Sequence, residues 1–372
     1  MFSLRLEELP LPTGNRETSM LLDWICESLC LVRKRSDGFS VDNSQITISR
    51  LMREFFLENP NKGHTIAEMT DSLGISAATL HHHLSRLQTS RLVSCTSENT
   101  DGGRVYFLRG GSLLKTVELL SSEAKQIFSI RMEQLSEWYE SIDGGREKID
   151  GLEIIDDLPL RIWIKEPIPL AEKNNYDGKT LWMADLGLLG DRPGRMMSDD
   201  SVPRLIFDKL ITSKTPLSID EILAEYPDAK RSKIQRTLEC FRSSGIIERI
   251  PRLDLLPSFV WNMLHTQFRR RGAEWLLNKG GLIRLIGEKK SSKLIDNLNK
   301  KKCSVEDVEL ILSDIPSKDK MLLLNLLGGK LPLGYRMIEE NAQEVSKKLL
   351  NRLDQVLRRL RRVSELLEQS LQ

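Results

Sequence analysis

Residues 65–93 read TIAEMTDSLGISAATLHHHLSRLQTSRLV, and this stretch decides the fold of the N-terminal part of the chain. Apolar residues recur at helical spacing through 65–73 and again through 77–88. Between the two runs, Gly74 permits the left-handed backbone that ends a helix, and Ser76 can cap the helix that follows. The stretch therefore predicts a short helix, a tight turn and a second, longer helix.

Two helices joined in this way are typical of a helix-turn-helix, which places its second helix in the major groove of DNA. Leu80, Leu84 and Leu87 form one apolar stripe on 77–88, so this side is expected to face the core. The other sides carry small or hydrogen-bonding side chains, as a close approach to base edges requires. We expect DNA contacts from Ser76, Ala77, Thr79, His81, His82, Ser85 and Arg86, with His81, His82 and Ser85 toward the bases and Ser76, Thr79 and Arg86 toward the backbone.

A β-hairpin is predicted directly after this helix. Residues 92–95 and 104–108 have the composition of strands, and the polar stretch between them ends in Asp-Gly-Gly. A hairpin over 94–108 with a flexible tip corresponds to the wing of a winged helix. From this wing, Arg104 is expected to reach a phosphate or the minor groove.

The run ISAATLHHHLSRL at 75–87 resembles the recognition-helix signature of ArsR-type winged-helix repressors, and the resemblance extends over about residues 45–140. It implies a winged helix-turn-helix fold, a homodimer, and transcription regulation with double-stranded DNA as the partner. Many members of that family sense metals through cysteines in the first helix of the motif. The corresponding stretch 65–73 contains no cysteine, so we expect neither a metal nor another cofactor.

The three consecutive histidines at 81–83 suggest a metal cluster at first sight. Adjacent residues on a helix point about 100° apart, so their side chains cannot converge on one ion. We expect His83 to pack near the core and His81 and His82 to face solvent or DNA. A winged helix can also act purely as a protein-interaction module, and this interpretation stays open.

Composition restricts the class of protein. The chain has 372 residues, 40% of them hydrophobic and 29% charged, with a net charge of only +2. Its length predicts two or three domains. No signal peptide or membrane span is expected. The five cysteines show no paired spacing, which fits a reducing cytoplasm. The expected location of the protein is therefore the cytoplasm, in association with the nucleoid. An enzyme is not expected, because phosphate-loop, dinucleotide-binding and nucleophile-elbow motifs are missing from the sequence.

A second cycle of the same kind follows the first. Residues 202–212, 218–225 and 228–244 repeat the helical pattern, and 245–250 resembles the strand after it. The stretch 251–257 gives no clear hairpin, so a reduced or wingless version is expected. The helix 228–244 carries basic residues on its early turns, which are Lys230, Arg231, Lys233 and Arg236.

Two long amphipathic helices are predicted over 112–142 and 335–372. Helices of this length suggest self-association by helix pairing. The alternative for 112–142 is packing within the same chain, and for 335–372 it is docking on a partner. Between the second cycle and the last helix, residues 268–302 contain eleven basic and three acidic residues, a net charge of +8. Such a cluster attracts phosphate without sequence preference, although it can also be an ordinary solvated surface.

These patterns predict a mainly α fold with small β-wings, built from tandem winged-helix-like domains and long amphipathic helices. The expected function is a dimeric, DNA-binding transcription regulator, whose effector the sequence does not identify. An architectural, chromosome-organising DNA-binding protein and a winged-helix scaffold subunit are the alternatives. The expected domains are 1–142 with the first winged helix, 143–200 as an irregular connector, 201–257 as the second winged-helix-like domain, 258–334 as a basic helical region and 335–372 as a long C-terminal helix.

Overall fold

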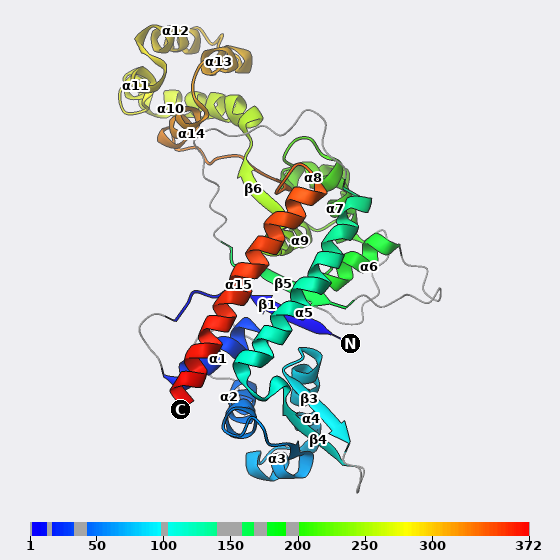
Figure 1. Ribbon diagram of the computed structural model, residues 1–372. Helices are drawn as coiled ribbons and strands as arrows, with labels where there is room; N and C mark the ends of the chain where they lie inside the picture. The colour runs from blue at the N-terminus through cyan, green and yellow to red at the C-terminus, as the bar shows by residue number, and fades with distance from the viewer. Residues whose placement is uncertain are drawn as a thin grey trace.

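The computed structural model describes residues 2–12, 17–32, 43–97, 103–139, 158–166, 177–190 and 201–371, with no side chains placed at 43–46. The described chain is mainly helical and contains three small antiparallel sheets, as the sequence predicts (Figure 1). Residues 143–157, 167–176 and 191–200 of the expected connector lie outside the described residues.

The N-terminal half contains the predicted helix-turn-helix and hairpin elements. Strands β2, β4 and β3 form one antiparallel sheet beside α3 and α4. The helix expected to reach residue 142 ends at Glu133 and continues as a 3-10 turn. The elements are β1 (Ser3–Glu7), α1 (Thr18–Ser28), α2 (Asn43–Leu51), the π-helix η1 (Met52–Leu57), β2 (His64–Thr65), α3 (Ile66–Leu73), α4 (Ala77–Thr89), β3 (Val93–Ser97), β4 (Arg104–Leu108), the 3-10 turn η2 (Arg109–Gly111), α5 (Leu113–Glu133) and the 3-10 turn η3 (Gln134–Glu137).

The C-terminal half repeats this order, with one large insertion. The stretch expected to be wingless has a hairpin, because β6 pairs with a strand that returns only at residue 333. The last helix correspondingly begins at Ala342, not at 335, because the preceding residues form that strand. The elements outside the insertion are β5 (Arg161–Lys165), α6 (Gly178–Asp185), α7 (Val202–Thr212), α8 (Ile219–Glu225), α9 (Arg231–Ser243), β6 (Ile247–Pro251), β7 (Leu333–Met337) and α15 (Ala342–Leu371).

A separate group of helices is inserted between β6 and β7. It comprises residues 253–331, and we call it the lobe. Figure 1 shows it extending from the body beyond β6. Its buried residues, such as Leu264, Leu294 and Leu324, form a hydrophobic core distinct from that of the body. Its elements are the 3-10 turn η4 (Leu253–Leu255), α10 (Leu256–Leu277), α11 (Leu282–Ile286), α12 (Glu288–Asn299), α13 (Val305–Leu312) and α14 (Ser317–Leu326).

The two helix-turn-helix segments share a side-chain cap and a strand pairing at equivalent positions. We call α2–β4 the first unit, and α7–α9 with β6 and β7 the second unit. Thr65 and Ser218 cap α3 and α8 in the same way. His64 pairs with Tyr106 of β4, and Leu217 pairs with Tyr335 of β7. The sequence indicated only a partial repeat, whereas the backbone shows that the hairpin strand is repeated as well.

The repeat also includes the segments before the two units. Strands β1 and β5 pair antiparallel, and helices α1 and α6 follow them. Both helices end in a left-handed residue, Cys30 with φ 49° and Gly187 with φ 75°. The backbone oxygens of these two residues accept from equivalent positions, because Arg86 of α4 donates to Cys30 and Cys240 of α9 donates to Gly187.

Equivalent elements of the two halves contact each other reciprocally. Helices α5 and α15 run antiparallel, with Glu118 paired to Arg361 near one end and Met132 bonded to Ser346 near the other. Lys125 pairs with Asp354 at the middle of the contact, and in the repeat these two residues are equivalent. Arg5 of β1 likewise lies opposite its equivalent, Trp163 of β5. The halves are therefore related by an approximate two-fold axis through these two pairs.

The predicted helix pairing is thus found within one chain. The apolar stripe of α15 is buried against α5 and α1. For α5, packing within the same chain is the alternative that the sequence left open. Self-association of two chains stays a prediction, but the helix faces expected to drive it are already covered. The buried residues of α15 are Ala342, Val345, Leu349, Leu353, Val356, Leu357, Leu360, Val363, Ser364 and Leu367.

Candidate nucleic-acid interface

The turn before α4 sets the direction of that helix. Gly74 ends α3 with φ 66°, a left-handed conformation that glycine adopts without steric cost. The hydroxyl of Ser76 then accepts from the backbone N–H of Thr79 at 3.2 Å and contacts the Thr79 hydroxyl at 2.9 Å. Ser76 therefore caps α4, and the side chains of Ser76 and Thr79 are exposed at its N-terminus, where a helix favours anions.

The outer face of α4 is free for contact. Leu80, Leu84 and Leu87 are buried, as their spacing predicts. The opposite face exposes small and hydrogen-bonding side chains without a bulky aliphatic group among them. The exposed residues of this face are Ala77, Ala78, His81, His82 and Ser85.

Two residues of α4 lie inside the fold. His83 is 3% exposed, and burial, with His82 and Arg86 nearby, lowers the pKa of its imidazole. It is the packed histidine that the sequence predicts. Arg86 is half-buried and donates from Nη2 to the carbonyl of Cys30 at 2.6 Å. This hydrogen bond holds the guanidinium at the end of α1, so Arg86 is less accessible for the expected contact with the DNA backbone.

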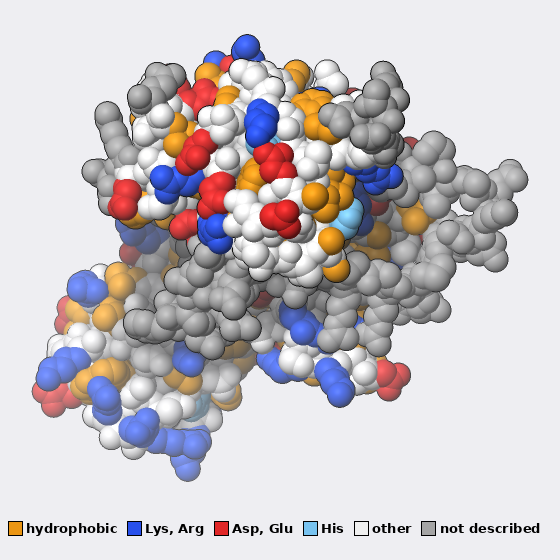
Figure 2. Space-filling view, turned by 90° about the horizontal axis from the view of Figure 1, so that it is seen from below, with side chains coloured by type: hydrophobic (Ala, Val, Ile, Leu, Met, Phe, Trp, Pro, Cys, Tyr) orange, Lys and Arg blue, Asp and Glu red, His pale blue; other side chains and the backbone are white. Residues whose placement is uncertain are grey.

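The hairpin β3–β4 flanks α4. Arg104 begins β4, opposite Ser97, and is exposed with no ion pair to any described residue. The hairpin tip at 98–102 lies outside the described residues. Acidic groups are also close, since α3 carries Glu68 and Asp71 on its exposed side. Figure 2 views the first unit from below, and acidic and basic side chains are interspersed there.

Helix α9 is the equivalent of α4, and its chemistry differs. Ile234, Leu238 and Phe241 are buried on one side, while Gln235 and Arg236 occupy the places of His81 and His82 on the exposed side. Three exposed cations of this helix and its cap make no ion pair with a described residue, whereas Arg231 pairs with Asp220. These three are Lys230, Lys233 and Arg236. The sequence analysis pointed out these basic residues but did not assign them to a site. Their spacing along the helix, which places them on its exposed side, could have indicated one.

The lobe carries the basic segment. Of its eleven Lys and Arg residues in 268–302, Lys290 pairs with Asp314 and the Arg271 guanidinium lies 4.5 Å from the Trp275 ring centre. Blue side chains gather on the lobe at the lower left of Figure 2. The other nine are exposed and form no ion pair with a described residue. These are Arg269, Arg270, Lys279, Arg284, Lys289, Lys293, Lys300, Lys301 and Lys302.

Arg252 fixes the junction between the second unit and the lobe. Its side chain is 4% exposed and donates to Asp254 through two nitrogens, at 2.8 and 2.7 Å. It also donates to Glu221 and to the Pro216 carbonyl, each at 2.6 Å. The hydrogen bonds that Arg252 donates to Asp254 and Glu221 raise the pKa of Arg252 and lower the pKa values of both carboxylates. Its backbone N–H bonds to Pro332, so both ends of the lobe are held together.

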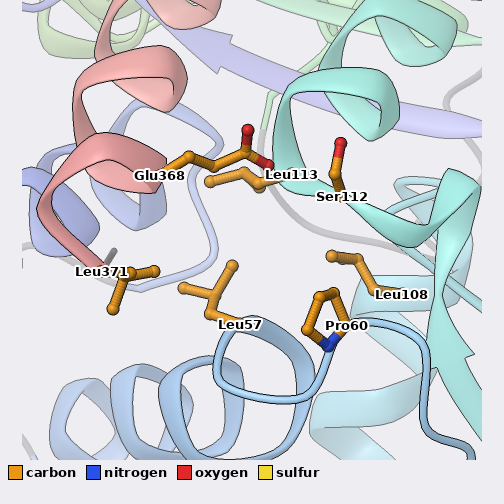
Figure 3. A pocket seen from close by; sticks show the side chains of 7 residues that line it. All are labelled: Leu57, Pro60, Leu108, Ser112, Leu113, Glu368 and Leu371. Atoms are coloured by element: carbon orange, nitrogen blue, oxygen red, sulfur yellow. The ribbon is translucent and has the colours of Figure 1, made fainter.

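A pocket of about 240 Å³ lies where the end of α15 meets the first unit (Figure 3). Its single carboxylate, Glu368, accepts from the backbone N–H of Leu114 at 3.0 Å. This N–H lies in the first turn of α5, where helices leave donors unsatisfied, so Glu368 joins α15 to the start of α5. The pocket is therefore a structural junction. Its lining residues are Leu57, Pro60, Leu108, Ser112, Leu113, Glu368 and Leu371.

Among the described residues, no group of three or more His, Cys, Asp or Glu side chains is arranged to hold a metal ion. None of the helices in the described part combines the length and the apolar character needed to cross a membrane. No family model matches the chain, and no curated protein matches it either.

Proposed function

We propose that the chain is a DNA-binding transcription regulator whose first unit is a winged helix-turn-helix of the ArsR type and whose second unit is a winged-helix-like domain. In this proposal α4 enters the major groove and the β3–β4 hairpin contacts the DNA beside it. The observation that carries it is the exposed face of α4, which combines a capped, open N-terminus with His81, His82 and Ser85. Imidazole and hydroxyl groups can donate to and accept from base edges.

The repeat of the same segment adds support. The side-chain cap at the start of the first helix of the motif and the strand pairing recur in the second unit, with α9 in the place of α4. A chain that repeats a helix-turn-helix around an approximate two-fold axis has the arrangement with which dimeric regulators meet two half-sites. A purely scaffolding role would not require the outer faces of both helices to be free.

The test is selection of duplexes from a random pool by the full chain, followed by binding of the selected duplex to a His81→Ala/His82→Ala variant. Each lost base contact should cost about 1–3 kcal/mol, or roughly 5- to 150-fold in affinity for the selected duplex. Affinity for unrelated duplexes should stay the same. A matched control is Gln343→Ala/Gln355→Ala on the exposed face of α15.

If the His81→Ala/His82→Ala variant and the control distinguish the selected duplex from unrelated duplexes equally well, the proposal that α4 contacts bases is wrong. A chain without any salt-dependent affinity for duplex DNA would favour the scaffold alternative. Selection that yields no preferred sequence, together with tight binding, would favour the architectural alternative.

A further inference from the structure

We propose that one chain binds one DNA duplex across two unequal half-sites. In the first, α4 reads bases, and in the second, α9 and the lobe hold the phosphate backbone. This inference rests on the proposed DNA-binding function and assigns different tasks to the two units. It arises from the two-fold relation between them and from the difference in charge between their exposed surfaces.

The first step is symmetry. An approximate two-fold axis passes through the Lys125–Asp354 and Arg5–Trp163 pairs, and equivalent elements lie at the same height along such an axis. Helices α4 and α9 are equivalent, so both have the same tilt and lie on the same side along that axis. Two subunits of a symmetric dimer present their recognition helices to DNA in this way. Here a single chain supplies both helices.

The second step is chemistry. On α4 the exposed groups are neutral or hydrogen-bonding, and the nearest arginine, Arg86, is bonded to the Cys30 carbonyl. At the start of α9 Lys230, Lys233 and Arg236 are exposed and unpaired among the described residues. Neutral donors and acceptors distinguish bases, whereas flexible cations bind phosphate with little sequence preference. Helix α4 is therefore suited to distinguishing bases, and α9 to binding the phosphate backbone.

The third step is the position of the lobe. In the first unit, the connection between the hairpin strands is the short tip at 98–103, and in the second it is the whole segment 252–332. The lobe therefore occupies the place of a wing tip, which in this fold lies beside the groove that the helix enters. The Arg252 hydrogen bonds hold it there instead of leaving it on a loose tether. Its nine exposed cations are consequently carried at the far end of the β6–β7 hairpin, on the lobe that extends beyond β6 (Figure 1).

The magnitude of the electrostatic effect favours this division. Each phosphate contact contributes about 0.9 to the slope of log affinity against log salt concentration. The first unit offers Arg104 and few other free cations, whereas α9 and the segment 268–302 of the lobe together offer twelve among the described residues. Most of the salt dependence of binding should therefore originate in the second unit.

The experiment measures salt dependence with the full chain and a duplex of about 25 base pairs, somewhat over two helical turns. The lobe variant is Lys289→Gln/Lys293→Gln/Lys300→Gln. Lys289 and Lys293 lie one turn apart on one face of α12, and Lys300 is the residue that follows its last turn. A second variant, Lys233→Gln/Arg236→Gln, tests α9. The control removes three charges from the exposed face of α15 by Lys347→Gln/Arg358→Gln/Arg362→Gln. Thermal unfolding checks that all variants fold.

The salt slope should fall by about 2 to 3 in the lobe variant and by about 2 in the α9 variant, without a change in base preference. The control should leave the slope unchanged, and saturation should occur at one chain per duplex. An unchanged slope in folded lobe and α9 variants, or two chains per duplex, would overturn the inference while DNA binding itself persists.

Absence of duplex binding by the wild-type chain would instead remove the proposed function on which the inference depends. An RNA duplex and vesicles containing phosphatidylserine serve as comparison ligands. If the lobe variant loses affinity for one of these and keeps its full salt slope on DNA, the assignment of the lobe to a DNA backbone is wrong.

Discussion

Lys125 and Asp354 occupy equivalent positions on α5 and α15 and form an ion pair between the two helices. In a symmetric dimer, such a position would bring two identical residues together. Two lysines or two aspartates would repel each other, so opposite charges favour pairing of the two different helices. The hydrogen bond from Lys125 is the main reason why the pKa of Asp354 is lowered, although burial acts in the opposite direction. The contact is partly exposed and contributes modestly to stability.

His83 gives a prediction on pH. Burial lowers the pKa of its imidazole below the usual 6.5, so the folded chain resists protonation more than the unfolded chain does. Protons therefore favour unfolding as the pH falls through about 6.5, and the stability from a neutral His83 is lost in that direction. Urea unfolding at pH 7.5 and 5.5 should show a smaller loss for His83→Leu, by at most about 1.4 kcal/mol per pH unit.

An exposed residue without a titrating side chain provides the comparison for this experiment, since Ser85→Ala should keep the pH dependence of the wild-type chain. Equal pH dependence in the wild-type chain and His83→Leu would mean that His83 takes up its proton as easily in the folded state as in the unfolded state.

At the scale of elements, the pair α5–α15 is expected to contribute most to the joining of the two halves. Leu353 is fully buried in this pair, one residue from the Lys125–Asp354 contact. Leu353→Ala removes a buried side chain from a packed interface and should lower the free energy of unfolding by about 2–5 kcal/mol. Denaturant unfolding monitored by circular dichroism measures this change.

Leu119 on α5 is the matched control, because it is 44% exposed. Leu119→Ala should change the free energy of unfolding by less than about 0.5 kcal/mol. Similar losses for both substitutions would show that burial within this helix pair does not determine stability.

The sequence predicted those elements whose signals are local. The helices on either side of Gly74 and the strand pair around Arg104 are found close to their expected bounds, because caps and turns lie near them in the sequence. Strand β7 was assigned to a helix, since its partner β6 lies beyond the lobe in the sequence. Strand β5 lies in the stretch 143–200, which was expected to be an irregular connector, and its pairing with β1 was not predicted, because no short-range pattern indicates that pairing.

The candidate site was predicted to a similar extent. Exposure of His81, His82 and Ser85 and burial of His83 follow from helical periodicity alone. The inward position of Arg86 depends on Cys30, which is distant in the sequence, so periodicity could not indicate it. Whether these residues bind DNA stays a prediction.

At the scale of the whole molecule, the lobe is an addition to an otherwise complete repeat. Its core is separate, and its ends meet where Arg252 bonds to Pro332. Replacing 253–331 by Asn-Gly, which favours a tight hairpin turn, should therefore leave the rest of the chain folded. The melting temperature should change by less than about 5 °C. Differential scanning calorimetry and circular dichroism measure this directly.

The shortened chain should keep the base preference of the wild-type chain and lose much of its salt dependence. An insoluble or molten product would show that the body needs the lobe for its own stability. A chain with the lobe intact and the conservative substitution Lys330→Arg serves as the control for handling.

Helix α15 begins directly after β7 of the second unit and ends at the pocket beside the first unit. With 30 residues, it is about 45 Å long. A helix of this length fixes the distance between the two ends of the body. Lengthening it by four residues would shift its end by about 6 Å and rotate it by about 40°. In the proposed complex, the length of α15 would then set the preferred distance between the two half-sites on the duplex.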